Sequence, residues 1–132
     1  MSHVRPVDVN SLKVGSYIVI DNEPCKIVEL TTSKPGKHGS AKARIVAIGI
    51  FDNVKRSIVV PTSSKVNVPE IRKTTAQVIA VLPESVQLMD LNTYETYEVP
   101  LPDDESLRSK LEPGIEVEVW EIMGRRKIMR TK

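Results

Sequence analysis

The sequence predicts an all-β protein built from two small barrels, with one short helix in the second. Three observations support this fold class. Short β-branched runs recur along the 132 residues, turn-forming residues separate them, and Pro69 interrupts the pattern where the charge balance changes sign. Hydrophobic residues make up 40% and charged residues 27%, as in ordinary globular proteins. Aromatic residues make up only 4%, so we expect cores of Val, Ile, Leu and Ala.

The first half of the chain shows closely spaced strand signals. The run Tyr-Ile-Val-Ile is followed by Asp-Asn-Glu-Pro, which predicts a tight turn into a hairpin partner. A loop is expected over 32–41, after which alternation resumes with Lys42, Arg44 and Val46 on one face. The expected strands span 17–20, 25–31, 42–50, 56–61 and 65–68. Such short strands with close turns favour a small barrel over an open sheet.

A domain boundary is expected at 69–72, which divides the chain into a first domain, 1–69, and a second, 70–132. Residues 1–72 carry eleven Lys and Arg against six Asp and Glu, a balance of +5. Residues 73–132 carry eight against eleven, a balance of −3. The basic first part is a weak indication of a polyanionic partner.

The second half predicts an oligonucleotide/oligosaccharide-binding (OB) fold. Its expected strands span 74–82, 85–90, 94–99, 115–122 and 127–130. A helix is expected between the third and fourth of these, begun by Asp103 or Asp104 and ended by Pro113 and Gly114. Three strands, a short helix and two strands is the order of an OB barrel. Acidic residues 103–105 could form a metal or acid–base site, but helix capping explains them better.

The least ordinary segment is the loop between the second and third expected strands. No acidic residue occurs from Leu30 to Phe51. Pro35 fixes its own φ, and Gly36 and Gly39 permit positive φ on either side of Lys37 and His38. We therefore expect a tight hairpin tip that points Lys37 outward. The basic residues of the segment are Lys34, Lys37, Lys42 and Arg44.

Several kinds of catalytic site fit the sequence poorly. A phosphate-binding P-loop would need glycine where Thr31 stands and Ser or Thr after Lys37. A zinc site needs about four ligands, whereas His3, Cys25 and His38 are scattered. Cys25 has no evident acid–base partner, so we expect a packed or edge thiol rather than a reactive nucleophile. No enzymatic activity is expected.

The basic loop leaves two interpretations open: a solvated turn, or a contact with nucleic-acid phosphates. The aromatic residues that stack on RNA bases are few and dispersed, which argues against sequence-specific recognition. No apolar run is long enough for a membrane span, and the N-terminus lacks a signal-peptide stretch. With a single cysteine, these features favour a cytoplasmic protein.

The segment Ser33-Lys34-Pro35-Gly36-Lys37-His38-Gly39-Ser40-Ala41-Lys42 closely resembles the modification loop of the translation initiation factor 5A family. The resemblance extends over nearly the whole chain, including Arg72-Lys73-Thr74-Thr75-Ala76-Gln77-Val78-Ile79. Pro35 and the short N-terminus resemble the archaeal branch. The family combines an SH3-like and an OB barrel, in agreement with the strand order above.

The resemblance implies that deoxyhypusine synthase transfers an aminobutyl group from spermidine to Lys37, giving deoxyhypusine and then, variably, hypusine. It implies action on the ribosome, at ribosomal RNA and the P-site tRNA, where the factor promotes peptide-bond formation at difficult sequences and aids termination. No cofactor, metal, membrane or small-molecule substrate is implied. The residues expected to contact RNA or the modifying enzyme are Ser33, Lys34, Pro35, Gly36, His38, Gly39, Ser40, Ala41, Lys42 and Arg44. A general RNA-binding or RNA-chaperone OB module, or a protein-interaction adaptor, is the alternative.

Overall fold

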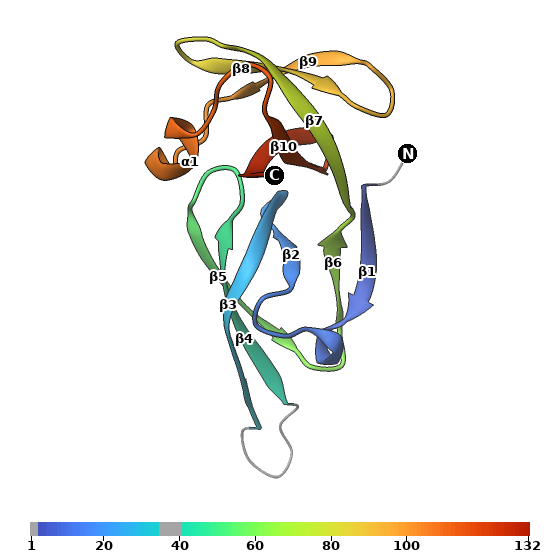
Figure 1. Ribbon diagram of the computed structural model, residues 1–132. Helices are drawn as coiled ribbons and strands as arrows, with labels where there is room; N and C mark the ends of the chain where they lie inside the picture. Colours follow the sequence, from blue (N-terminus) through green and yellow to red (C-terminus); the bar gives the residue numbers. More distant parts are fainter. Residues whose placement is uncertain (1–2, 35–40) are drawn as a thin grey trace. The chain divides into compact units, whose positions relative to one another are not determined.

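The computed structural model describes residues 3–34 and 41–132, which are almost entirely strands and turns (Figure 1). The chain divides into two compact units, Met1–Glu70 and Ile71–Lys132, here called unit 1 and unit 2. Each unit has its own curled β-sheet structure and its own hydrophobic core. The predicted fold class, all-β with two small barrels and one short helix, is confirmed.

Unit 1 is made of antiparallel strands. They are β1 (Val4–Asp8), β2 (Tyr17–Ile20), β3 (Glu23–Ser33), β4 (Lys42–Gly49), β5 (Lys55–Pro61) and β6 (Lys65–Pro69), with a 3₁₀ turn, η1 (Val9–Ser11), after β1. One sheet has the order β2-β3-β4-β5, and β1 pairs with β6 in a second. The predicted Asp-Asn turn joins β2 to β3, since Asp21 and Asn22 both have positive φ. Positive φ at both central residues is what two-residue hairpins require.

The strand β1 is a difference from the sequence prediction, which placed no strand before residue 17. Arg5 and Pro6 interrupt the apolar residues of this segment, so its sequence does not predict a strand. Proline is nevertheless tolerated at a sheet edge, where its missing N–H leaves no central ladder position unfilled. Pro6 lies opposite Asn67 in the two-stranded sheet, and this edge position accommodates it.

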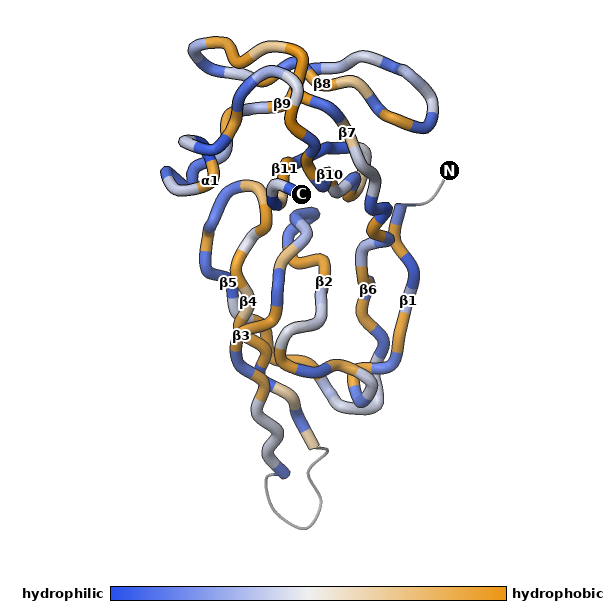
Figure 2. The backbone as a smooth tube through the Cα atoms, in the orientation of Figure 1, coloured by the Kyte–Doolittle hydropathy of each residue, from blue (hydrophilic) through white to orange (hydrophobic). Residues whose placement is uncertain are grey.

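The core of unit 1 is aliphatic, as its composition predicts. Ile18, Ile27 and Ile45 have no exposed surface, and Ala43 and Ala47 belong to the same buried cluster. Hydrophobic and hydrophilic positions alternate along β6 in Figure 2. This period-two pattern turns Val66 and Val68 toward the core and leaves Lys65 and Asn67 exposed.

Unit 2 is a single five-stranded antiparallel sheet with a short helix. The elements are β7 (Ile71–Val81), β8 (Ser85–Asp90), β9 (Thr96–Pro100), α1 (Glu105–Ser109), β10 (Glu116–Ile122) and β11 (Arg125–Thr131). The sheet order is β11-β10-β7-β8-β9, and the two outer strands, β9 and β11, contact each other. The sheet thus curls around a core that includes Val86, Leu88 and Val117.

Local signals in unit 2 are confirmed at the residue level. Of the two candidate helix caps, Asp104 is the one that acts: its Oδ1 accepts the backbone N–H groups of Ser106 at 2.9 Å and Leu107 at 3.3 Å. Met123 and Gly124 both have positive φ and connect β10 to β11 in a two-residue turn.

Candidate functional site

The site predicted from the sequence lies where β3 ends and β4 begins. Their antiparallel ladder continues outward to the pair Ser33 and Lys42, so the residues between these positions start and finish side by side. The loop was expected from residue 32, but β3 continues through Ser33 because Thr31 and Thr32 suit a pleated strand. The base of the loop is therefore fixed by strand pairing.

A third strand braces this base. Lys42 lies opposite Pro61 on β5. Thr62, the next residue after Pro61, forms hydrogen bonds with Ala41. The backbone N–H of Thr62 donates to the carbonyl of Ala41 at 3.0 Å, and its hydroxyl donates to the same oxygen at 3.3 Å. Nothing in the sequence around Thr62 indicated this role, because the contact joins positions twenty-one residues apart.

The central part of the predicted site lies outside the described residues. This applies to Pro35, Gly36, Lys37, His38, Gly39 and Ser40. The orientation and modification of Lys37 therefore stay predictions. Of the flanking predicted residues, Ser33, Lys34, Lys42 and Arg44 are exposed and Ala41 is partly buried.

The predicted alternation of β4 is confirmed, and it separates the charged residues from the core. Lys42 and Arg44 are exposed, whereas Ala43 and Ile45 between them have no accessible surface. Ile45 packs in the same cluster as Ile27 of β3. The basic side chains are thus carried by strands whose opposite face is anchored in the barrel.

The acid-free sequence around the loop did not predict the ion pairing of Arg44. Its Nη1 lies 3.6 Å from Oε1 of Glu29 on the neighbouring strand β3. Both side chains are about half exposed, and such surface pairs contribute only about 0–1 kcal/mol. Lys34 and Lys42, in contrast, form no ion pair with any residue in the described ranges. Their charge remains available to a polyanion.

A second charged group in unit 1 is structural. Arg56 donates through Nη1 and Nη2 to the two carboxylate oxygens of Asp52, at 3.2 and 2.8 Å. This bond, with the Val54 N–H, lowers the pKa of Asp52 to about 2. Burial raises the pKa of the nearby Cys25 thiol, the opposite of what an activated nucleophile requires. The expected packed thiol is confirmed, since Cys25 has no exposed surface.

Two other kinds of site are absent from residues 3–34 and 41–132. Within these ranges no three His, Cys, Asp or Glu side chains gather as metal ligands would. No helix in the same ranges has the length and apolar character needed to cross a bilayer.

Comparison with known families accounts for both units. Residues 2–64 match the family described as "Translation initiation factor 5A-like, N-terminal". Residues 70–132 match "Eukaryotic elongation factor 5A hypusine, DNA-binding OB fold". The two matches together cover nearly the whole chain, and the second agrees with the strand order of unit 2.

Similar proteins align with this chain over nearly its whole length. Translation initiation factor 5A of Thermofilum pendens is 62% identical over 128 residues and covers 97% of each chain. That of Pyrococcus furiosus is 61% identical over 134 residues, with 100% of this chain and 97% of the relative covered. A solved factor 5A structure from Methanococcus jannaschii has a TM-score of 0.91 at 53% identity, covering 100% and 97%. A Naegleria fowleri structure has a TM-score of 0.81 at 39% identity, covering 99% of both. The predicted resemblance is confirmed, and the chain belongs to the translation initiation factor 5A family.

Proposed function

We propose that this chain acts in the cytoplasm on the ribosome, next to peptidyl-tRNA, and promotes peptide-bond formation through a modified Lys37. The observation that carries the proposal is the paired end of β3 and β4 at Ser33 and Lys42. The Gly36-Lys37-His38-Gly39 run lies between these two positions in the sequence. Residues 70–132 match a family that is described by its hypusine, a modified lysine, and this match supports modification of a lysine in this chain.

The modification would change the physical reach of the side chain. Unmodified lysine presents one ammonium group, with an ordinary pKa of about 10.4, on a flexible stem. Transfer of an aminobutyl group from spermidine by deoxyhypusine synthase would about double that reach and add a second cationic nitrogen. A long, thin dication can enter a narrow space lined by RNA and contact phosphates and 2′-hydroxyl groups.

The residues around the loop would position the factor, and the ribosome would perform the chemistry. Lys34 and Lys42 are exposed and form no ion pair with a described residue, so they suit phosphate contacts. Holding peptidyl-tRNA in a reactive geometry lowers the entropic cost of reaction without any covalent step by the factor. We infer that the chain itself is not an enzyme.

Mass spectrometry of protein purified from its native source tests the modification. The expected result is a peptide in which Lys37 carries one aminobutyl group, with or without an added oxygen. A reconstituted translation assay on a proline-run message tests the activity. Native protein should relieve stalling, whereas unmodified recombinant protein should not. An unmodified Lys37 in the native protein would overturn the modification, and equal relief by both preparations would overturn its role.

A further inference from the structure

Strand β5 lies at one end of the sheet β2-β3-β4-β5, so only one of its two sides is paired (Figure 1). At the other end of this sheet, β2 contacts β6 of the two-stranded sheet. In unit 2, the two outer strands β9 and β11 contact each other. Among the described strands, β5 pairs with β4 alone. What can bind along β5 therefore depends on the backbone groups of its second side.

The hydrogen bonds at the two ends of β5 show which of its residues turn their backbone groups toward β4. The N–H of Gly49 donates to the carbonyl of Val54 at 2.9 Å, and the N–H of Thr62 donates to the carbonyl of Ala41 at 3.0 Å. The register between these two bonds has no irregularity. In an antiparallel pair, residues bonded in this way alternate with residues whose N–H and C=O groups point away from the partner strand. The outward-pointing residues of β5 are Lys55, Ser57, Val59 and Pro61.

The outward backbone groups of β5 are without hydrogen bonds over most of its length. The N–H and C=O groups of Lys55, Ser57 and Val59 on this side bond to no residue in the described ranges. Pro61 has no N–H, and its carbonyl accepts from the N–H of Ser64 at 3.1 Å. Donors and acceptors thus alternate along the edge from 55 to 59 without a partner. This is the arrangement to which an extended peptide adds as a further strand.

The side chains of these residues leave the edge accessible. Val59 is 61% exposed, and the side chains of Lys55 and Ser57 are exposed as well. At the alternate positions, Ile58 and Val60 pack against the core of unit 1 and fix the strand in place. Lysine and proline often protect the edge strands of natural proteins against pairing. Here they stand only at the two ends of β5, so its middle is unprotected.

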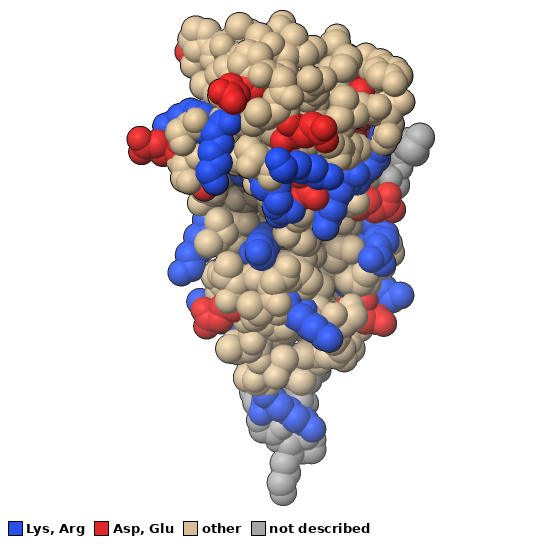
Figure 3. All heavy atoms as spheres, in the orientation of Figure 1, with Lys and Arg blue, Asp and Glu red and all other residues tan. Residues whose placement is uncertain are grey.

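The charge around β5 indicates which kind of strand would fit. From residue 30 to residue 69 the sequence contains seven Lys and Arg and one acidic residue, Asp52, whose carboxylate is bonded to Arg56. Lys55 and Lys42 form no ion pair with a described residue. At the lower end of the β3–β4 hairpin, the visible face in Figure 3 shows Lys and Arg atoms but no Asp or Glu atoms. A second copy of β5 would bring like charges together, whereas an acidic strand would place carboxylates near lysines.

The alternation of backbone groups favours a peptide over RNA. A phosphate can accept from the outward N–H groups of Ser57 and Val59, but it has no donor for their carbonyls. The backbone of an extended peptide supplies both donors and acceptors at the spacing of a β-ladder. The edge therefore matches a protein segment better than a nucleic acid.

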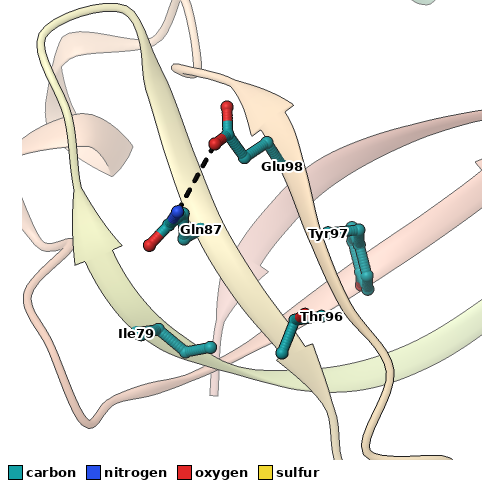
Figure 4. A pocket seen from close by; sticks show the side chains of 5 residues that line it. All are labelled: Ile79, Gln87, Thr96, Tyr97 and Glu98. Carbon is teal, nitrogen blue, oxygen red and sulfur yellow. Dashed lines mark hydrogen bonds between the residues drawn. The ribbon is translucent and has the colours of Figure 1, made fainter.

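The sheet of unit 2 has a hollow, but that hollow does not suit an acidic segment. It is a depression of about 300 Å³, lined by Ile79, Gln87, Thr96, Tyr97 and Glu98 (Figure 4). Glu98 accepts from Gln87 at 3.4 Å and from the hydroxyl of Ser85 at 3.3 Å, so a carboxylate is held at this surface. Like charges repel, and the hollow therefore disfavours the partner that β5 fits.

We propose that an extended acidic segment of a partner protein binds along β5 and adds a strand to the sheet β2-β3-β4-β5. The N–H groups of Ser57 and Val59 donate to carbonyls of the segment, and the segment donates to the carbonyls of the same two residues. Its carboxylates lie near Lys55. Neither Lys37 nor the ribosome takes part in this contact, so the proposal can fail or succeed separately from the proposed function.

The test measures binding of the full chain to a fluorescein-labelled peptide of about seven residues in which Glu and Val alternate. Saturable binding should protect the amides of Ser57 and Val59 from hydrogen exchange. The amides of Ile58 and Val60 face β4 already and should change little. Two further peptides carry N-methyl groups on every Glu or on every Val. Because only one of these sets can face β5, one of the two peptides should bind about fivefold or more weakly than the parent peptide.

Two variants of the chain test the edge itself. Val59→Pro removes one outward N–H without removing a bond to β4, and Lys55→Glu reverses the charge at the edge. Each should weaken peptide binding about fivefold or more. The control Lys13→Glu makes the same charge reversal at an exposed lysine of unit 1 outside β5, and it should bind like the parent chain. Thermal midpoints show whether the variants are folded; if Val59→Pro does not fold, Lys55→Glu and the methylated peptides decide.

Several results would overturn the proposal. They are no binding of the acidic peptide at low salt, equal binding by all three peptides, and equal weakening by Lys13→Glu and Lys55→Glu. A single-stranded RNA that displaces the peptide and protects the same amides would assign the edge to nucleic acid instead. Protection of Ser57 and Val59 on raising the concentration of the chain alone would assign it to a second copy.

Discussion

The carboxylate of Asp52 occupies the space that any side chain at Gly49 would need. A Cβ built on Gly49 would lie 1.9 Å from Oδ1 of Asp52, and 3.0 Å from Nη1 of Arg56. Glycine at this position therefore allows the Asp52–Arg56 pair to close over the end of β4.

Gly49→Ala is expected to lower the thermal midpoint by displacing Asp52, because the obstructing atom is the end of a movable side chain. The cost would then be the lost contacts of Asp52 with Arg56 and Val54. A double-mutant cycle with Asp52→Ala measures this directly, and Gly49→Ala should cost much less in the Asp52→Ala background. Additive effects of the two substitutions would show that the clash is not with Asp52.

The same pair predicts a pH dependence of stability. The hydrogen bond from Arg56 lowers the pKa of Asp52 from 3.8 to about 2 in the folded chain. Because the folded-state pKa is depressed, the stabilisation is fully present above the unfolded value and is lost as the pH falls through about 2. Urea unfolding between pH 4.5 and 2 should show a shallower decline for Asp52→Asn than for the parent chain. NMR titration of the Asp52 carboxyl would contradict this if its midpoint lay near 3.8.

Asp90 is expected to contribute to the same acid sensitivity in unit 2. It is nearly buried, with 6% of its surface exposed, and its carboxylate accepts the backbone N–H groups of Thr93 and Asn92, which lower its pKa. Asp90→Ala should destabilise the chain at pH 7 by about 1–3 kcal/mol, since both N–H groups lose their acceptor. Asp90→Asn keeps an acceptor oxygen and should retain part of the stability. Equal losses for Ala and Asn would rule out this turn as the cause.

Removal of the α1 cap should have a smaller effect. Asp104→Ala leaves two backbone N–H groups of the first turn without their acceptor and should cost about 1 kcal/mol. Asp104→Ser restores a capping oxygen and is the matched control. Urea denaturation measures both variants, and a loss in the serine variant as large as that in the alanine variant would argue against capping.

For the proposed modification, Lys37→Arg should abolish the mass increase in the native host while leaving the thermal midpoint unchanged. Arginine keeps the positive charge but lacks the amine that accepts the aminobutyl group. Lys13→Arg, an exposed lysine outside the loop, is the matched control, and it should retain the modification. A thermal shift as large as that of a core substitution would contradict an exposed role for Lys37.

Local sequence patterns predicted most of the architecture because alternation and turn chemistry act between near neighbours. Three features follow from residues a few positions apart in the sequence. They are strand β4, the helix cap at Asp104 and the Met123–Gly124 turn. Strand β1 was missed because Pro6 disguises an edge strand. In the candidate site, the pairing of Arg44 with Glu29 and the bracing of Ala41 by Thr62 depend on strand register. Register joins distant residues, so no local signal could reveal them.

The pairing of Ser33 with Lys42, braced by β5, also has a mechanical consequence. We expect the hairpin of β3 and β4 to be rigid, because its inner end packs into the core of unit 1 through Ile27 and Ile45. Adding or removing residues between 34 and 41 should therefore leave the strand register and the core of unit 1 unchanged. The length of the loop and the stability of the barrel can vary independently.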